Sequence, residues 1–436
     1  MSIHNRCSSC VSFLELTKVS LQGCLGCAIR NSHFYINKNH NSMKKIFTCI
    51  LSLILALSTI SAEKVRIGEL YYLLNERNST AKVTCQVDAW YGTTTYDNYN
   101  GLTSATIPET VSYNNVTYNV TGIGDKAFYQ CRSLVSVTIP NSITVIESEA
   151  FRTCINLTSA PIPNSVTNIG GYAFYDCNSL GSIDIPNSVT NIGWWAFGNC
   201  NTASSVSISN SLKSIPEGCF CNCSNISAII IPDSIIMIDA NAFSSTSISS
   251  ITIPEKVSSI GYNTFWKCSK LSKVTFANNV RSLSIGSGVF AYCNKLDSII
   301  LPNGLYKIGR EAFKECTNLK FVSLPKSLTQ ISSFAFDNCS ALTTIFNYAD
   351  TPITLDCVFW NVDQSKCALY VPQASLEAYQ EATEWKEFNP ILPIPGLEAV
   401  FQTTVREHHA TKTVYKGQIL IQNGEKKYTI TGAEIK

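Results

Sequence analysis

The chain has 436 residues, of which 45 % are apolar and 15 % charged, so it can build a sizeable core and is not intrinsically disordered. Its formal net charge is +2, but six of the 33 basic and only one of the 31 acidic side chains fall in residues 1–62, which leaves −3 for the remainder. This balance gives no indication of a nucleic-acid partner or of binding to an acidic membrane surface.

Residues 43–62 have the layout of a secretory signal peptide. Two lysines precede an apolar run over 46–60, and the small residues Ser61 and Ala62 follow it. The run is short for a membrane span, and no later stretch approaches 18 apolar residues. The pattern therefore predicts a secreted or surface protein with no transmembrane segment in its mature chain.

Residues 1–42 contain two Cys-x-x-Cys pairs, starting at Cys7 and Cys24, with the spacing of a four-thiolate zinc site. A folded zinc module upstream of a signal peptide conflicts with the way such signals act, which is at the N-terminus. We therefore expect translation to start at Met43, residues 1–42 to belong to no mature protein, and no metal site to form there.

From residue 123 onward, the chain repeats itself. Seven of the nine intervals between successive phenylalanines are 23 residues, and an isoleucine stands five residues before each phenylalanine. The phenylalanines are Phe128, Phe151, Phe174, Phe197, Phe220, Phe243, Phe265, Phe290, Phe313 and Phe336. Residue types in register at this period indicate a solenoid of about ten stacked units.

Each unit is expected to contain one short strand, for example over residues 180–185. Leu180, Ile183 and Ile185 point inward in this interpretation, and Ser182 and Asp184 point outward. A proline ends the strand because it cannot donate a ladder hydrogen bond. Stacked units would then form one parallel sheet.

The Ile-Gly-x-x-Ala-Phe-x-x-Cys segment within these units resembles the leucine-rich repeat of the BspA type (Bacteroides surface protein A), over about residues 105–350. Residues 63–122 look like the lead-in of that family, and Leu369, Tyr379, Trp385 and Phe388 look like its closing element. The resemblance implies a right-handed leucine-rich-repeat arc with its parallel sheet on the concave face. It also implies display outside the cell for adhesion or protein binding.

The tail around Asn423 and Gly424 alternates apolar and polar residues, which predicts a β-hairpin. The tail looks like short C-terminal modules of secreted Bacteroidetes proteins. The expected organisation is an upstream extension (1–42), a signal peptide (43–62), a lead-in (63–122), the solenoid (123–350), a C-terminal cap (351–390), and a linker with a short β module (391–436).

The histidines argue against an enzyme. The five of them are His4, His33, His40, His408 and His409, so none lies in the solenoid, and no glycine-rich phosphate loop follows a strand. We expect no catalytic residue, no cofactor and no metal, and we read His408 and His409 as solvated linker residues.

A cysteine stands three residues after nine of the ten phenylalanines, with Thr246 as the exception. The nine are Cys131, Cys154, Cys177, Cys200, Cys223, Cys268, Cys293, Cys316 and Cys339. One small, weakly polar side chain per coil is typical of a buried ladder of unreactive thiols. Cys219 and Cys221 stand outside the column, and a disulfide involving them, or between Cys357 and Cys367, stays open because sequence cannot fix pairing.

Two sets of variable positions are candidates for binding. The first lies on the concave strand face and is rich in hydroxyl groups, with the members Ser182, Asp184, Lys273, Thr275, Asp297, Lys320 and Phe321. The second is aromatic, with Tyr172 and Trp195 at equivalent positions of adjacent units and Tyr175 and Trp194 nearby. The alternative for the aromatic set is that it packs on the convex surface and only shields backbone.

We therefore expect a binding protein that engages extracellular or host matrix proteins, or other cell surfaces, through its repeats. The alternative is a structural spacer or coat component with no recognition role of its own. The two hypotheses differ in whether truncating surface residues weakens binding while the fold stays intact.

Overall fold

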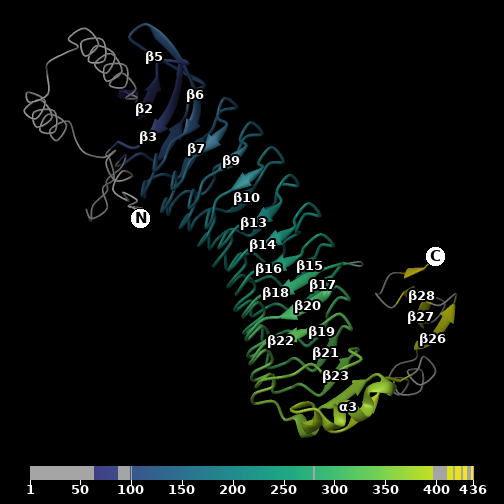
Figure 1. Ribbon diagram of the computed structural model, residues 1–436. Helices are drawn as coiled ribbons and strands as arrows, with labels where there is room; N and C mark the ends of the chain where they lie inside the picture. Colours follow the sequence, from purple (N-terminus) through teal and green to yellow (C-terminus); the bar gives the residue numbers. More distant parts are fainter. Residues whose placement is uncertain are drawn as a thin grey trace, which may run out of the picture. The chain divides into compact units, whose positions relative to one another are not determined.

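The computed structural model describes residues 63–86, 99, 101–277 and 280–395, together with four short strands between 410 and 435 (Figure 1). The predictions for residues 1–62, among them the signal peptide and the paired cysteines, lie outside the described residues, and so do His408 and His409. Within the described part of the chain, no helix is both long and apolar enough to cross a bilayer.

The described chain opens with a cap of mainly antiparallel strands. β1 (Glu63–Ile67), β2 (Leu70–Asn75) and β3 (Thr80–Thr84) pair in sequence order, and β5 (Thr110–Tyr113) pairs with β6 (Val116–Ile123). Gly68 has a φ of +62° in the two-residue turn between β1 and β2, a conformation that favours glycine. β3 pairs parallel to β6 and so joins the cap to the solenoid.

One side of the solenoid is a ladder of very short parallel strands that end on the repeated isoleucine, here called the isoleucine ladder. After β6 its members are β8 (Val145–Ile146), β9 (Asn168–Ile169), β11 (Asn191–Ile192), β13 (Ser214–Ile215), β14 (Met237–Ile238), β16 (Ser259–Ile260), β18 (Leu283–Ile285), β20 (Leu305–Ile308) and β22 (Gln330–Ile331). The ladder is interrupted between β11 and β13. Before the interruption, the residue that follows the isoleucine of each unit after the first donates its N–H to the isoleucine carbonyl of the preceding coil. After Ile215 this residue is Pro216, which has no N–H to donate.

A second ladder, here called the strand face, contains the strand that the sequence predicts. Its members are β4 (Ser104–Thr106), β7 (Ser136–Thr138), β10 (Ser182–Asp184), β12 (Ser205–Ser207), β15 (Ser250–Ile253), β17 (Lys273–Phe276), β19 (Ser298–Ile300), β21 (Phe321–Leu324), β23 (Thr344–Asn347), β24 (Ala368–Val371) and β25 (Ile391–Pro393). On β10 the expected alternation is confirmed, with Ile183 buried and Ser182 and Asp184 exposed. The solenoid with parallel strands is thus confirmed, but most units carry two strands rather than the expected one. The strands also form several separate parallel sheets, four of them on the strand face, rather than the expected single sheet.

The third side, here called the turn face, is also hydrogen-bonded from coil to coil. Glu149, Phe151 and Thr153 donate their backbone N–H groups to carbonyls of the next coil at 2.7–2.9 Å. The residues two before and two after each phenylalanine have positive φ, which side-chain-bearing residues seldom adopt. They are Lys126, Gln130, Glu149, Thr153, Tyr172, Asp176, Trp195, Asn199, Gly218, Asn222, Asn241, Ser245, Asn263, Lys267, Gly288, Tyr292, Glu311, Glu315, Phe334, Asn338, Cys357 and Asn361. The repeated bonding pattern therefore holds the same unusual backbone in every coil.

The core between these sides is a continuous column of phenylalanine rings. Successive rings from Phe128 to Phe359 lie 5.0–6.0 Å apart with interplanar angles of 2–18°. Phe359 belongs to an eleventh unit, which lies within the predicted C-terminal cap. This unit carries Thr354 where the others carry isoleucine and Val362 where all but one of the others carry cysteine, and these changes hide the repeat.

Both ends of the ring column are closed by other aromatic residues. At the start, Tyr99 lies 5.4 Å from Phe128, and its hydroxyl donates to the carbonyl of Thr84 at 2.6 Å. At the end, Trp385 and Phe388 meet Phe359 at interplanar angles of 64° and 88°. The closing segment consists of η1 (Gln364–Lys366), β24, η2 (Gln373–Ser375), α3 (Leu376–Glu381), η3 (Trp385–Glu387) and β25. Rings turned edge-on end the parallel stack.

The C-terminal strands form a separate antiparallel sheet. β26 (Ala410–Tyr415), β27 (Gln418–Asn423), β28 (Lys426–Thr429) and β29 (Glu434–Ile435) pair in sequence order. Asn423 pairs with Lys426, as the predicted hairpin requires.

Candidate binding surfaces

The polar residues predicted for binding on the strand face are exposed and dispersed. Ser182 and Asp184 share β10, where the Ser182 hydroxyl donates to Asp184 Oδ2 at 3.2 Å. Lys273 and Thr275 point outward from β17, while Asp297 and Lys320 lie just before β19 and β21. None of the charged side chains of Asp184, Lys273, Asp297 and Lys320 forms an ion pair with another described residue. The fold therefore places the predicted residues on one face but does not bring them together into one site.

Phe321, the remaining predicted residue of this face, lies in an aromatic cluster. The Phe346 ring stacks on the Tyr370 ring at 4.5 Å with an interplanar angle of 13°, and it lies 5.6 Å from the Phe321 ring. Tyr348 adds a ring 6.4 Å from Phe346 and is 42 % exposed, and Ile300 on β19 is 68 % exposed. Ile300, Phe321, Phe346, Tyr348 and Tyr370 are called the sheet cluster below.

Sequence reasoning missed most of the sheet cluster, although a signal exists. On β23 the buried Ile345 and Asn347 flank Phe346, so a period of two places the Phe346 ring on the outer side. The register pairs Phe346 with Tyr370 across β23 and β24. Tyr370 directly follows Leu369 of the predicted closing element, outside the predicted repeats, so this cross-strand pair cannot be recognised before the register is known.

The predicted aromatic set on the turn face is indeed brought together, around Arg152. The rings of Tyr172 and Trp194 lie 4.9 Å apart, and Tyr175 contacts both Tyr172 at 5.2 Å and Trp195 at 6.1 Å. The Arg152 guanidinium lies 4.9 Å from the Tyr172 ring centre and 5.4 Å from that of Tyr175, within cation–π range. These five residues are called the turn cluster.

The members of the turn cluster differ in how much surface they offer. A Cβ added at Gly218 would lie 2.3 Å from Trp195 Cδ2, so the indole rests directly on the backbone of the next coil. Trp195, Tyr172 and Tyr175 are half-buried, whereas Trp194 is 57 % exposed. Trp194 also lies against backbone, since a Cβ added at Gly171 would be 2.8 Å from its Nε1, but it is the ring of the set that presents the larger surface.

Two further coils carry a cation beside aromatic rings on the turn face. Lys267 Nζ lies 4.1 Å from the Trp266 ring centre, and Trp266 packs edge-on against Tyr292 at 6.0 Å. The Arg310 guanidinium lies 5.0 Å from Phe334, whose ring is 6.3 Å from that of the exposed Trp360. These groups are spread over many coils, so the turn face has separate aromatic spots rather than one strip.

The nine cysteines in register are buried free thiols that lie beside the phenylalanine column. From Cys154 onward, each donates its S–H to the carbonyl of a phenylalanine one coil earlier at 3.0–3.3 Å. Burial raises the pKa of the Cys268 thiol to about 11, although a hydrogen bond to Thr246 works in the opposite direction. Cys219, Cys221, Cys357 and Cys367 are also free thiols in the structure.

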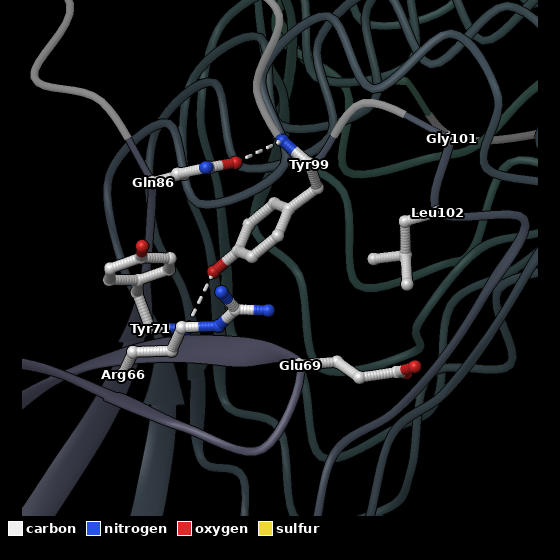
Figure 2. Close-up of a pocket in the computed structure, with 7 residues that line it drawn as sticks. All are labelled: Arg66, Glu69, Tyr71, Gln86, Tyr99, Gly101 and Leu102. Atoms are coloured by element: carbon white, nitrogen blue, oxygen red, sulfur yellow. Dashed lines mark hydrogen bonds between the residues drawn. The ribbon is translucent and has the colours of Figure 1, made fainter.

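A hollow of about 380 Å³ lies beside the N-terminal end of the ring column. Figure 2 shows Tyr99 inside it, with its hydroxyl accepting the backbone N–H of Tyr71 at 2.8 Å. The Arg66 guanidinium lies 5.9 Å from the Tyr71 ring centre and donates to the carbonyl of Gly68. The Tyr71 N–H and the Thr84 carbonyl hold the Tyr99 ring that starts the column, which gives the hollow a structural role.

Comparison with known proteins identifies the repeat. The model of the BspA type leucine rich repeat region matches in six copies, over residues 91–206, 196–285 and 283–366. A search of curated proteins finds no match.

Among solved structures, a leucine rich cell surface protein from Faecalibacterium prausnitzii is 25 % identical, with a TM-score of 0.47, and the match covers 72 % of this chain and 97 % of that one. A leucine-rich repeat protein from Bacteroides ovatus is 24 % identical, with a TM-score of 0.35 and coverage of 65 % and 94 %. The pneumococcal vaccine antigen PcpA is 17 % identical, with a TM-score of 0.47 and coverage of 77 % and 99 %.

Proposed function

The chain belongs to the family of BspA type leucine-rich repeat proteins, and on this basis we propose that it is an exported protein that binds protein partners outside the cell. The binding surface is the strand face, centred on the sheet cluster. This binding serves adhesion to matrix proteins or to another cell surface.

The observation that carries the proposal is that the sheet cluster places aromatic rings where the fold does not need them. The outward positions of β10 and β12 are serine and aspartate, so the ladder forms without large apolar groups there. Phe346 and Tyr370 are already stacked on each other, which limits the entropy lost on binding. Exposed apolar patches rimmed by polar residues are typical of protein interaction sites.

The polar residues of the strand face complete the proposed surface. Lys320 directly precedes Phe321, and Asp297 directly precedes Ser298, which pairs with Phe321, so the two residues provide a charged rim for the sheet cluster. Lys273 and Asp184 extend the same face toward the N-terminus. Rim charges of this kind steer encounters and select partners more than they add affinity.

The turn cluster is proposed as a second, smaller contact through Trp194 with Tyr172 beside it. Its rings are fixed by the Arg152 guanidinium, which is itself held by Glu149 at 3.0 Å. Tyr175 packs edge-on against Tyr172, and Trp195 packs against Tyr175.

Export is supported by the pattern of residues 43–62. If it is cleaved after Ala62, mass spectrometry of the exported protein should find Glu63 or a neighbouring residue at the N-terminus. A peptide from residues 1–42 in the mature protein would contradict this part of the proposal.

The binding proposal is tested with two tyrosines of equal exposure on different ladders. Tyr348 in the sheet cluster is 42 % exposed, and Tyr306 on the isoleucine ladder is 43 % exposed. Residues 63–436 and the variants Tyr348→Ser and Tyr306→Ser would be measured by biolayer interferometry against immobilised matrix proteins and cell-surface extracts. We expect Tyr348→Ser to weaken binding about tenfold or more and Tyr306→Ser to leave it unchanged.

Circular dichroism must show that both variants are folded. Equal binding by both variants would remove the sheet cluster from the proposal. A folded chain that binds nothing on any surface tested would favour the structural spacer instead.

A further inference from the structure

The two strand ladders differ in how their N-terminal ends are covered. The isoleucine ladder continues past β6 into β3, β2 and β1, so its first coil is covered by a sheet. The strand face begins at β4, which pairs with β7 on one side and with no described strand on the other. The edge of β4 is therefore an open end of the second ladder.

Hydrogen-bond alternation identifies the groups that this edge presents. The carbonyl of Thr103 accepts the N–H of Val135, and the N–H of Ile107 donates to Thr138, so residues 103, 105 and 107 face β7. Because successive residues of a strand face opposite sides, the N–H and C=O groups of Ser104 and Thr106 face the open edge. Within the part of the chain that the structure describes, nothing bonds to them.

The far end of the same ladder is protected. The outermost strand there is β25, which ends in Pro393 and lies between Pro390 and Pro395. Proline lacks the N–H that an added strand would need, and prolines at an edge are a common means of blocking strand addition. β4 contains no proline and no charged residue, so it lacks this protection.

A groove of about 570 Å³ runs along the open edge of β4. Its floor contains the buried side chains of Leu70, Tyr72, Ala105 and Val111. Glu69 is the one ionisable carboxylate among the described residues that line it. The groove thus combines unpaired backbone groups, an apolar floor and a single negative charge.

The floor has space for one inward side chain. Val137 on β7 pairs with Ala105, and the equivalent inward position is held by Ile183 on β10 and by Val206 on β12. A strand added beside β4 would point the residue opposite Ala105 into the core side and its two neighbours outward. The small alanine leaves room for that residue to be apolar and branched.

We propose that the open edge of β4 binds an extended peptide segment of a partner protein by strand addition. The peptide pairs with the backbone of Ser104 and Thr106, places a valine or isoleucine against Ala105, and carries a lysine or arginine that meets Glu69. Strand addition derives affinity from backbone hydrogen bonds and selectivity from alternate side chains. This site lies at the opposite end of the ladder from the sheet cluster and does not depend on it.

The probe is a fluorescein-labelled seven-residue peptide of alternating valine and threonine with one terminal lysine, and a matched peptide ends in glutamate. Fluorescence anisotropy with residues 63–436 should show saturable binding of the lysine peptide and at least about threefold weaker binding of the glutamate peptide. Thr106→Pro, which removes the edge N–H, should weaken the lysine peptide about tenfold. Thr106→Val keeps the N–H and should bind as the unchanged chain does.

Hydrogen–deuterium exchange at single-residue resolution gives a readout that does not depend on a variant's folding. The amides of Ser104 and Thr106 should exchange fast in the free chain and slowly with saturating peptide, whereas that of Ala105 should be slow in both. No anisotropy change with either peptide, or unchanged exchange at Ser104 and Thr106 with peptide bound, would overturn the proposal. Protection that rises with protein concentration without peptide would assign the edge to a second copy of this chain, which also overturns it.

Discussion

The solenoid contains two groups of aromatic rings, one in its core and one on its surface, and they differ in residue type, spacing and orientation. Inside, the rings from Phe128 to Phe359 repeat once per coil, lie nearly parallel and are fully buried. Outside, the sheet cluster and the turn cluster use mixed tyrosine, tryptophan and phenylalanine rings at varied angles. The inner group is repeated because every coil must be filled in the same way.

The outer groups are not repeated, and this separates their role from that of the column. Other coils fold with small or polar residues at the corresponding positions, for example Ser182 on β10 and Asn241 on the turn face. An aromatic residue that only some coils carry is not required by the repeat. We therefore expect mutations of the two groups to separate stability from binding.

The largest effect is expected inside the column. Phe243→Ala should lower the free energy of unfolding by about 3–5 kcal/mol, because the fully buried ring leaves a cavity between two stacked neighbours. Urea denaturation followed by circular dichroism measures this change. Phe346→Ser is the matched control in the outer group, with an expected loss of about 1 kcal/mol or less. Similar losses for the two variants would break the distinction between the groups.

Alkaline pH should destabilise the buried core of the solenoid. The pKa of Cys268 is about 11 in the folded chain and 9.0 without burial, so below pH 9 the thiol is protonated in both states and the stability is fully present. Between pH 9 and 11 the thiol ionises only in the unfolded chain, and the free energy of unfolding falls by at most about 3 kcal/mol.

Denaturation at pH 8, 9.5 and 11 tests whether the free energy of unfolding falls as the pH rises. Cys268→Ala should show a smaller fall than the unchanged chain. An equal slope in both would mean that other groups, such as the buried tyrosines, account for the alkaline loss.

A smaller effect is expected where the turn cluster rests on backbone. Gly218→Ala adds a methyl group 2.3 Å from Trp195 Cδ2 at a residue with a φ of +61°, so it should cost about 1–3 kcal/mol in unfolding free energy. Adding Trp195→Ala should return part of that loss, since the clash is removed while the backbone strain stays. Gly181→Ala is the control, because its nearest neighbour is a carbonyl 3.9 Å away.

The smallest stability effect is expected for the most exposed indole. Trp194→Ala should change the free energy of unfolding by about 0.5 kcal/mol or less, because its ring is 57 % exposed. The same thermal unfolding series should include Trp195→Ala, which uncovers Gly218 and should lose more. The reverse order would show that the contact of Trp194 with Gly171 stabilises the fold more than the contact of Trp195 with Gly218.

The repeat and its buried positions could be predicted because they follow from one-dimensional periodicity. Strict spacing puts Phe174 beneath Phe197, and a period of two buries Ile183. The isoleucine ladder could not be predicted, since two-residue strands such as Asn191–Ile192 carry no alternation of their own. The eleventh unit was hidden because Thr354 and Val362 replace its marker residues.

The sheet cluster was only partly predictable for a related reason. Phe321 was identified from its position after a unit's leucine, but its neighbours Phe346 and Tyr370 come from later coils. Their proximity depends on the register of β21, β23 and β24, which long-range pairing sets and local sequence does not. The four aromatic residues of the turn cluster were predictable because equivalent positions of adjacent units are 23 residues apart, whereas Arg152, which lies between their rings, was not predicted.

The most direct test of the account is hydroxyl-radical footprinting of the chain with and without a bound partner. We expect oxidation of Phe346, Tyr348 and Tyr370 to fall on binding, while oxidation of Trp360 and of Tyr306, which is as exposed as Tyr348, stays the same. Protection confined to Tyr306 or Trp360, with the sheet cluster still oxidised in the complex, would contradict the claim that this cluster is the binding surface.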